Sequence, residues 1–164
     1  MKSPWRVARL AQAWLAMALF VMWWGGFTFY AAVVVPTGHQ VLHSTIKQGF
    51  ITQSVTNRLN ILGVVALLML LWQRCAHPTA DSMTIKRLLS MTWLVMAGSL
   101  AALFWLHPYL DQLLDQGNRR IIDEDHFYQL HQWYLLISTV QWLAGAVHLG
   151  ALTLPRTNST MTIL

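Results

Sequence analysis

Apolar residues are gathered into long runs that prolines and polar segments separate. Three runs are nearly uninterrupted, at about residues 10–35, 88–107 and 127–154, and a proline follows directly after each of them. A helix needs about 20 mainly apolar residues to cross a bilayer, and proline seldom continues a helix. Each run therefore predicts a membrane-spanning helix that ends at its proline.

A fourth span is less regular. Its uninterrupted apolar core, Ile61–Trp72, holds only 12 residues. It reaches spanning length only over about residues 53–73, with several polar residues included near its start. The pattern predicts an all-α fold, a four-helix transmembrane bundle with antiparallel helices. The whole chain, residues 1–164, then forms a single integral membrane domain.

A short amphipathic segment lies between the first and second spans. The apolar residues of Val41–Ile51 recur at helical spacing. His39, His43 and Lys47 follow one another four residues apart on the opposite face. A segment with one apolar and one polar face is typical of a helix that lies in the membrane interface. We therefore expect an interfacial helix over residues 41–51.

The composition supports a membrane location. Hydrophobic residues make up 55% of the chain and charged residues 10%, whereas soluble domains carry about 25% charged residues. The formal net charge of +5 is spread thinly between apolar runs and forms no basic patch, so we expect no nucleic-acid partner. A cleaved signal peptide is the alternative for the first run, but that run is longer than the usual 7–15 apolar residues of a signal. We interpret it as a retained anchor.

The basic residues predict the orientation. Cytoplasmic loops are enriched in Lys and Arg, and a cytoplasmic N-terminus places seven of the 11 basic residues inside. Those seven are Lys2, Arg6, Arg9, Arg74, Lys86, Arg87 and Arg156, and the four outside are Lys47, Arg58, Arg119 and Arg120. The chain is therefore expected in the bacterial inner (cytoplasmic) membrane, as a multi-pass protein with both termini in the cytoplasm.

The fourth span carries a polar stripe at helical spacing. Its members are His131, Tyr134, Ser138, Gln141, Gly145 and His148, and the opposite stripe is wholly apolar. Polar groups are costly in hydrocarbon and usually face the interior of a bundle. The stripe indicates either a polar pocket or contacts that pack the helices together, because small and hydrogen-bonding residues also serve at helix interfaces.

The second span has a matching polar face. Gln53, Thr56, Asn57 and Asn60 recur on it at helical spacing, and Thr28 of the first span lies at a similar depth. Together these residues predict a polar outer half of the bundle and an apolar inner half. Arg58 needs either an anionic partner or a path to the headgroups, and the second interpretation is favoured.

Histidines could make the outer half a cofactor site. Imidazole binds haem iron, copper and zinc, and His131 faces inward on the polar stripe. We expect His131 to be the first ligand of haem b or a metal ion such as copper, with a second ligand from His43, His107 or His39. Tyr134, Asn57 and Asn60 would line the site. His148 lies 17 residues from His131, about 25 Å along a helix, so the two cannot share one metal ion.

Enzyme signatures are absent from the sequence. It contains no G-x-S-x-G, no phosphate-binding glycine loop, no H-E-x-x-H and no C-x-x-C. Cys75 is the only cysteine, so a cysteine metal cluster is excluded. No acid lies within the predicted spans, which disfavours a carboxylate proton relay. We therefore lean against an enzyme.

Several short motifs carry a resemblance to known proteins. They are Trp24-Gly25-Gly26, Phe29-Tyr30, Val35-Pro36, Gln48-Gly49-Phe50, Val55-Thr56-x-x-Leu59-Asn60, Phe127-Tyr128-x-x-His131-x-x-Tyr134-Leu135 and Ser138-Thr139-x-Gln141-Trp142. In these motifs, over about half of its length, the chain resembles small bacterial four-helix integral membrane proteins of unknown function. Its layout is more distantly similar to copper-resistance D-like membrane proteins. The resemblance implies the fold and the membrane location, and it carries no activity.

Two classes of function remain open at this point. One is a binding or redox protein whose polar, His-containing pocket in the outer half holds haem b or a metal ion. The other is a non-catalytic scaffold or accessory subunit of a membrane complex, in which the polar stripe only joins helices. Its partners would be the lipid bilayer and either another membrane protein or further copies of this chain.

Overall fold

The computed structural model describes residues 4–76, 82–115 and 120–153. Within these ranges, four helical segments are long and apolar enough to cross a membrane: Trp5–Leu42, Ile46–Ala76, Met83–Gln112 and Glu124–Thr153. Each predicted span falls inside one of them, apart from residue 154, which lies outside the described residues. The predicted all-α bundle of four long helices is therefore confirmed, and the chain is a multi-pass membrane protein.

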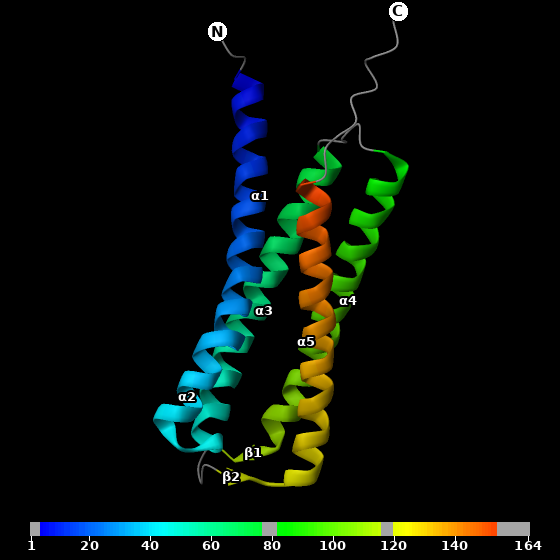
Figure 1. The fold of residues 1–164 in the computed structure, drawn as a ribbon. Coiled ribbons are helices and arrows are strands. Elements are labelled where there is room, and N and C mark those ends of the chain that lie inside the picture. Colours follow the sequence, from blue (N-terminus) through cyan, green and yellow to red (C-terminus); the bar gives the residue numbers. More distant parts are fainter. Residues whose placement is uncertain (1–3, 77–81, 116–119, 154–164) are drawn as a thin grey trace, which may run out of the picture.

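The chain passes back and forth along the bundle (Figure 1). The elements, in order, are α1 (Pro4–Phe29), η1 (Tyr30–Val34), α2 (Val35–Leu42), α3 (Thr45–Ala76), α4 (Met83–Gln112), β1 (Leu114–Asp115), β2 (Arg120–Ile121) and α5 (Glu124–Thr153). The start of α1 and the end of α5 lie at one end of the bundle, which we call the terminal end. The antiparallel pair β1–β2 and α2 lie at the other, which we call the hairpin end.

The sequence predicted that the first helical segment ends at Pro36, but the segment continues through it. A π-helical turn, η1, precedes this proline, and the Val35 N–H donates to the carbonyl of Tyr30, five residues back. A π-turn is a common way to fit a residue that disturbs the ordinary ladder. The helix therefore continues through Pro36 as α2, to Leu42.

The separate amphipathic helix predicted over residues 41–51 is not present with those bounds. His43 adopts a left-handed conformation, with φ at 45°, and this reverses the chain after Leu42. Ser44 then caps the next helix, because its hydroxyl accepts from the Lys47 N–H at 3.4 Å. The first part of the segment belongs to the end of α2 and the rest to the first turns of α3.

The third span also extends beyond its predicted end at residue 107. Pro108 lies inside α4, which continues to Gln112. The next helix, α5, begins three residues before the predicted 127, since Asp123 accepts from the His126 N–H at 3.1 Å and caps it. Because α4 continues past the predicted end at residue 107, Asp111 is part of this helix.

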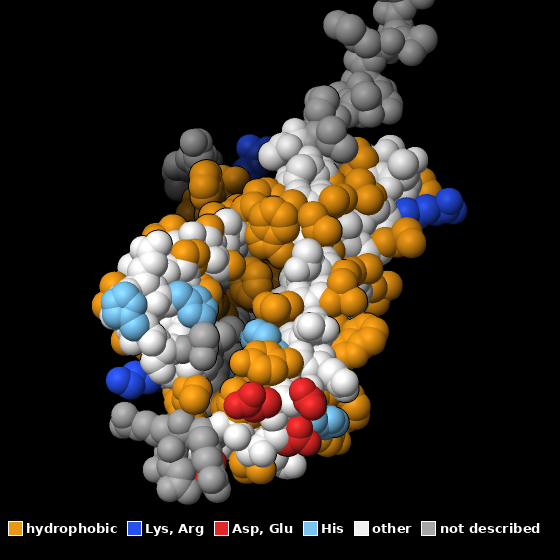
Figure 2. Space-filling view, turned by 60° about the horizontal axis from the view of Figure 1, so that its bottom comes forward, with side chains coloured by type: hydrophobic (Ala, Val, Ile, Leu, Met, Phe, Trp, Pro, Cys, Tyr) orange, Lys and Arg blue, Asp and Glu red, His pale blue; other side chains and the backbone are white. Residues whose placement is uncertain are grey.

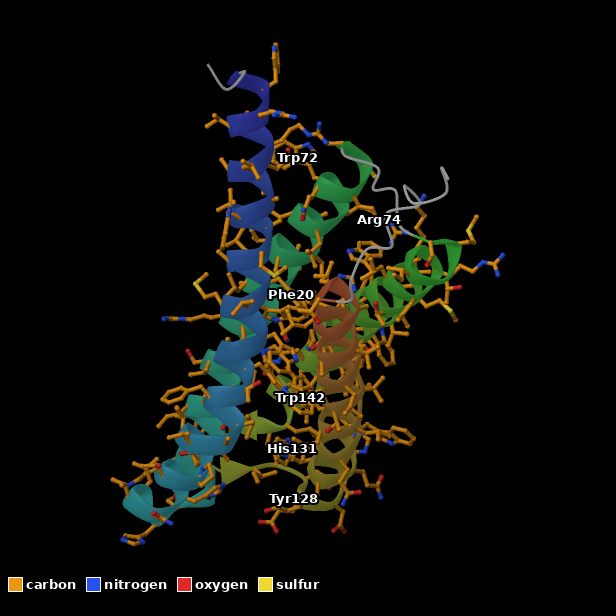
Figure 3. The ribbon with its side chains drawn as sticks, turned by 45° about the horizontal axis from the view of Figure 1, so that its top comes forward. Phe20, Trp72, Arg74, Tyr128, His131 and Trp142 are labelled. Carbon is orange, nitrogen blue, oxygen red and sulfur yellow. The ribbon has the colours of Figure 1, made fainter. Side chains whose placement is uncertain are left out.

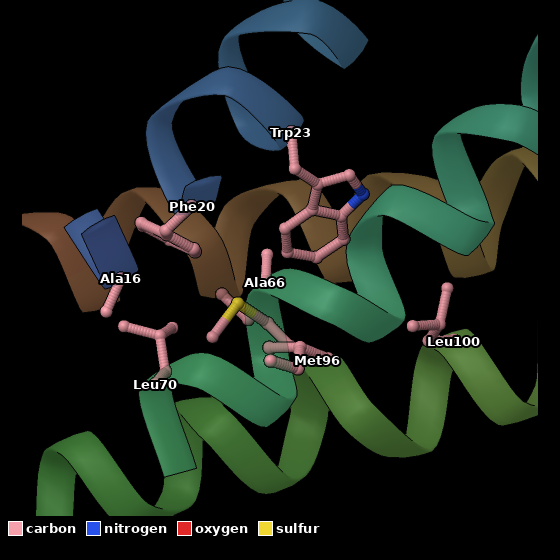
Figure 4. Close-up of a cluster of buried hydrophobic side chains, with 9 residues drawn as sticks. Ala16, Phe20, Trp23, Ala66, Leu70, Met96 and Leu100 are labelled. Carbon is pink, nitrogen blue, oxygen red and sulfur yellow. The ribbon is translucent and has the colours of Figure 1, made fainter. Parts of the chain in front are cut away.

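Apolar packing is concentrated in the terminal half of the bundle. Helix α4 packs mostly against α5, and α1 mostly against α3. Four helices contribute to one cluster of buried side chains, most of which Figure 4 draws: Ala16, Phe20, Trp23, Ala66, Leu67, Leu70, Met96, Leu100 and Ala144. A second cluster joins α4 to α5 nearer the hairpin end, through Leu103, Leu106, Leu110 and Tyr134. Buried polar side chains occur in both halves: Gln48, Thr56 and Asn60 lie toward the hairpin end, and Thr92, Gln141 and His148 lie beside the apolar cluster.

Candidate functional site

A buried hydrogen bond joins the two predicted polar faces. The Asn60 Nδ2 on α3 donates to the Tyr134 hydroxyl on α5 at 3.0 Å, and both side chains are buried. Thr56, one turn before Asn60, is also buried and donates to the carbonyl of Thr52. The two stripes therefore meet inside the bundle, as the sequence predicted, and they meet by hydrogen bonding.

A second polar group lies closer to the hairpin end and joins α3 to α4. The Gln53 Nε2 donates to the Asp111 Oδ1 at 2.6 Å. The other carboxylate oxygen of Asp111 is 3.6 Å from the Nε2 of His107, one turn earlier on α4. The ring of His107 is also 6.3 Å from the ring of Tyr134. His107 is thus near the Asn60–Tyr134 bond, but a carboxylate faces it.

His131 faces the interior but forms no hydrogen bond with any residue that the structure describes. Figure 3 shows it on the side of α5 that faces the rest of the bundle. The side chain is half-buried. Its ring stacks on Phe127, with centroids 5.8 Å apart and planes 6° apart. Of the two predicted ligands that are not exposed, His107 and His131, only His131 has no partner for its ring nitrogens among the described residues.

The structure separates three predicted site residues from this cluster. His39, on α2, and His43, after it, are exposed, and Figures 1 and 3 place α2 and α5 on opposite sides of the hairpin end. Asn57 is exposed on α3, whereas Asn60 is buried. Since Asn57 and Asn60 lie three residues apart near the edge of one helix face, periodicity could not tell which of them points inward.

The other end of the α5 stripe also bonds to a neighbouring helix. His148, only 5% exposed, has its Nδ1 2.7 Å from the Thr92 hydroxyl of α4. Two turns earlier on α5, the Gln141 amide donates to the carbonyl of Met96 of α4 at 3.3 Å. The His148 ring lies 5.5 Å from Phe20 of α1. These contacts place His148 in the apolar half, remote from the cluster around Tyr134.

Two neighbouring tryptophans on α1 connect it to α3 and to α5. A Cβ added at Gly63 would lie 2.7 Å from the ring of Trp23, and one added at Gly145 would lie 2.6 Å from the ring of Trp24. The Trp24 Nε1 donates to the carbonyl of Trp142 at 3.0 Å, and the two rings stack with centroids 5.5 Å apart. Each indole ring therefore packs against a glycine of the facing helix, Trp23 against Gly63 and Trp24 against Gly145, in space that a larger side chain would fill.

The Trp142 indole completes this contact by donating to the Thr28 hydroxyl at 2.8 Å. Sequence reasoning missed this contact, although it singled out Thr28 and Gly145 as polar or small residues. Tryptophan is common in membrane proteins at the boundary between membrane and water, so its presence alone does not predict a contact between helices. Nothing in the spacing says which tryptophans insert between helices.

Among the residues that the structure describes, the side chains of Gln48 and Ser138 are buried without partners. Neither the amide nitrogen and oxygen of Gln48 nor the hydroxyl oxygen of Ser138 forms a hydrogen bond there. Gln48 is 2% exposed, and its amide lies directly against Gly38 of α2, so a larger residue at 38 would have to displace the end of the Gln48 side chain. Unpaired buried polar groups are uncommon in folded proteins, so these two positions are candidates for either a bound molecule or a cost in stability.

The hairpin end also carries a surface cluster of acids. Figure 2 shows Asp and Glu side chains gathered over the start of α5, where Asp123, Glu124 and Asp125 are exposed. Acids in the first turn of a helix interact favourably with its dipole. The described residues contain no group of three or more His, Cys, Asp or Glu side chains placed to hold a metal ion.

Comparisons with known proteins do not assign this arrangement. No family model matches the chain, and neither a curated protein nor a solved structure does. The functional argument therefore depends on the residues themselves.

Proposed function

We propose that the protein is a non-catalytic accessory or scaffold subunit of a membrane complex, built as a single integral membrane domain over residues 1–164. The observation that carries the proposal is the use of the inward polar side chains of α5. Tyr134 bonds to α3, while Gln141 and His148 bond to α4. Polar side chains that bond to neighbouring helices are typical of helix packing in membranes.

The tryptophan contacts support the same interpretation. Trp24 and Trp142 hold α1 against α5 by stacking and by two hydrogen bonds. These tryptophan and threonine side chains therefore form contacts between helices of the bundle itself. A protein of this kind would act through its presence in an assembly, either with another membrane protein or with further copies of itself.

The test is gentle purification from the native membrane followed by native mass spectrometry. The proposal expects a stoichiometric complex, either of several copies or with a second membrane protein. A monomer that carries haem or stoichiometric metal would contradict it.

The second candidate is a haem b or metal-handling protein of the redox class. The specific observation in its favour is His131, whose inward ring has no hydrogen-bond partner among the described residues and lies one turn from Tyr134. His107 would be the second ligand, and Tyr134 and Asn60 would line the site. His39, His43 and Asn57 contribute less, because they are exposed. Copper is the metal that the imidazole donors suit best.

A spectrum and an elemental analysis test this candidate. Haem b would give a Soret band in mild detergent, and His131→Ala should abolish or shift it, whereas copper would appear in the elemental analysis. The matched control is His126→Ala, because His126 is exposed on the same helix. Unchanged spectra in His131→Ala would end this candidate.

We also propose that the protein lies in the bacterial inner membrane with both termini in the cytoplasm. The proposal is supported by the seven-to-four distribution of Lys and Arg. In this orientation the hairpin end faces outward and the terminal end faces the cytoplasm.

A further inference from the structure

Most exposed aromatic side chains lie at two levels along the bundle. Near the hairpin end they are Phe29, Phe104, Trp105, Tyr109, Tyr128 and Trp133. Toward the terminal end they are Trp14 and Trp72, and Trp5, at the start of α1, lies beyond them. Tryptophan and tyrosine are enriched where a membrane meets water. We call the two sets the hairpin belt and the terminal belt.

Contacts between helices relate the hairpin belt to α3. The Asn60–Tyr134 bond brings Trp133 level with about Leu59. The Gln53–Asp111 bond brings Tyr109 level with about Val55. The hairpin belt therefore surrounds residues 53–60 of α3. From Thr56, in the middle of this stretch, to Trp72 is 16 residues, or about 24 Å of helix, somewhat less than the roughly 30 Å of a typical hydrocarbon core.

Three polar side chains on the outside of α3 lie within the hairpin belt. Ser54, Asn57 and Arg58 are all exposed. Positions three and four residues apart are neighbours on a helix surface, so the Ser54 hydroxyl lies beside both the Arg58 stem and the Asn57 amide. Asn57 and Arg58 themselves, adjacent in sequence, point about 100° apart around the helix axis. Arg58 makes no hydrogen bond or ion pair with any residue that the structure describes.

The direction of α3 determines where Arg58 points. In a helix each Cα–Cβ bond tilts toward the N-terminus of the helix, and α3 begins at the hairpin end. Arg58 therefore leans past Ser54, away from the hydrocarbon core. A long basic side chain at this depth keeps its stem in apolar surroundings and its charge among the headgroups.

We propose that Ser54, Asn57 and Arg58 form a binding site for the phosphate of an anionic phospholipid at the hairpin end. The guanidinium supplies a positive charge and two parallel donors, which suit a phosphodiester. The hydroxyl of Ser54 supplies a further donor beside the guanidinium, and the amide of Asn57 supplies another on the far side of Ser54. The lipid chains would lie along the exposed apolar surface toward the terminal end, which Ile61 and Val65 begin.

Charge favours a lipid as the occupant. Within the hairpin belt, the described residues of this α3 face carry one positive charge, Arg58, and no carboxylate; Lys47, about three turns earlier on the same face, lies outside the belt. Its position within a belt of aromatic side chains is the depth at which phosphates lie. A carboxylate of a partner protein could pair with Arg58 only if it lay at the same depth in the membrane.

The test measures which phospholipid stays bound to the purified full-length protein. The protein is incubated in mild detergent with equal amounts of dioleoyl-phosphatidylglycerol and dioleoyl-phosphatidylcholine, and the adducts are counted by native mass spectrometry. The wild type should retain phosphatidylglycerol over phosphatidylcholine. Arg58→Gln should lower that ratio about fivefold, and Asn57→Ala about twofold, as expected for partly exposed charge-assisted contacts.

Lys47→Gln is the matched control, because Lys47 is an exposed basic residue on the same helix that lies outside the belt. Its ratio should equal that of the wild type. Thermal unfolding of each variant checks that it is folded. Arg58→Lys keeps the positive charge but loses the two parallel donors of the guanidinium, so its ratio of bound phosphatidylglycerol to phosphatidylcholine should be intermediate.

Three results would overturn the site. They are a wild-type ratio near one, an unchanged ratio in Arg58→Gln, and an equal fall in Lys47→Gln, which would mean that total charge alone attracts the lipid. A protein partner that is lost with Arg58→Gln while the lipid ratio stays constant would likewise overturn it, in favour of a protein occupant.

Discussion

At the scale of single residues, two glycines explain how large side chains fit between the helices. Gly63 receives Trp23 and Gly145 receives Trp24, each with less than 3 Å between the ring and an added Cβ. Small residues that admit a neighbour are characteristic of membrane helix interfaces. Here the neighbour is an indole ring rather than a backbone, so α1 and α5 are connected by side chains.

Gly145→Ala tests this contact. The added methyl group would meet the Trp24 ring and should lower the free energy of unfolding by about 1–3 kcal/mol. Gly150→Ala on the same helix is the control, because nothing lies within 4 Å of an added Cβ there. It should leave stability unchanged or raise it by up to about 1 kcal/mol. Unfolding in micelles, followed by tryptophan fluorescence, measures both, and equal effects would contradict the contact.

Gln48 gives a prediction of the opposite sign. Its buried amide has no partner, and each unpaired buried polar group costs about 1–3 kcal/mol. Gln48→Met, of similar length and without the amide, should therefore raise the unfolding free energy by about 1 kcal/mol or more. The same unfolding assay measures it. A clear loss of stability would mean that the amide is hydrogen-bonded in the membrane, for example to water.

At the scale of helices, periodicity predicted which faces meet but not where the helices end. The stripe from His131 to His148 is inward, and its partners lie on α3 and α4 as an interior stripe requires. The ends at Pro36 and Pro108 were wrong because proline only removes one donor and crowds the preceding turn. A π-turn accommodates the first of these prolines, and α4 contains the second.

The difference between the predicted and observed helix ends changed which residues lie in the candidate site. Since α4 continues past Pro108, Asp111 lies one turn from His107 on the same helix and faces Gln53. A prediction that ended the helix at residue 107 could not place this carboxylate. His39 and His43 were predicted as ligands because they lie at the same outer level on a neighbouring segment, and periodicity could not show that both side chains are exposed.

Asp111→Asn tests the role of this carboxylate. Asparagine keeps one acceptor for Gln53 but loses the charge that faces His107, so the unfolding free energy should fall by about 0.5–1.5 kcal/mol at neutral pH. The measurement is the midpoint of denaturation in micelles. Asp123→Asn, which retains a capping oxygen for the exposed start of α5, is the comparison and should change it by less. A larger fall in the comparison would contradict a bridging role for Asp111.

At the scale of the whole molecule, the main apolar cluster and the polar cluster around Tyr134 lie at different depths. The cluster around Phe20 and Met96 fills the terminal half, and the hydrogen bonds of Asn60 and Asp111 lie toward the hairpin end, although Gln141 and His148 also form buried polar contacts in the terminal half. The depth of the polar cluster was predictable from the sequence, because polar residues of different spans fall at one depth. The docking of α1 on α5 was not, since it depends on which two tryptophans turn inward.

The orientation of this asymmetry can be measured with reporter fusions. A reporter fused after Asn118 should be active only outside the cytoplasm, and one fused after Thr157 only inside, because most basic residues flank the terminal end. A cytoplasmic signal at Asn118 would reverse the proposed orientation.

The central claim is that the inward polar side chains of α5 join helices, and the bond between Asn60 and Tyr134 tests it most directly. A double-mutant cycle with Asn60→Ala, Tyr134→Phe and the double variant isolates the free energy of this pair. For a hydrogen bond between membrane helices we predict a favourable coupling of about 0.5–1.5 kcal/mol. A coupling of zero, with single variants as stable as the wild type, would contradict the claim and would favour a role for Asn60 and Tyr134 in binding a ligand.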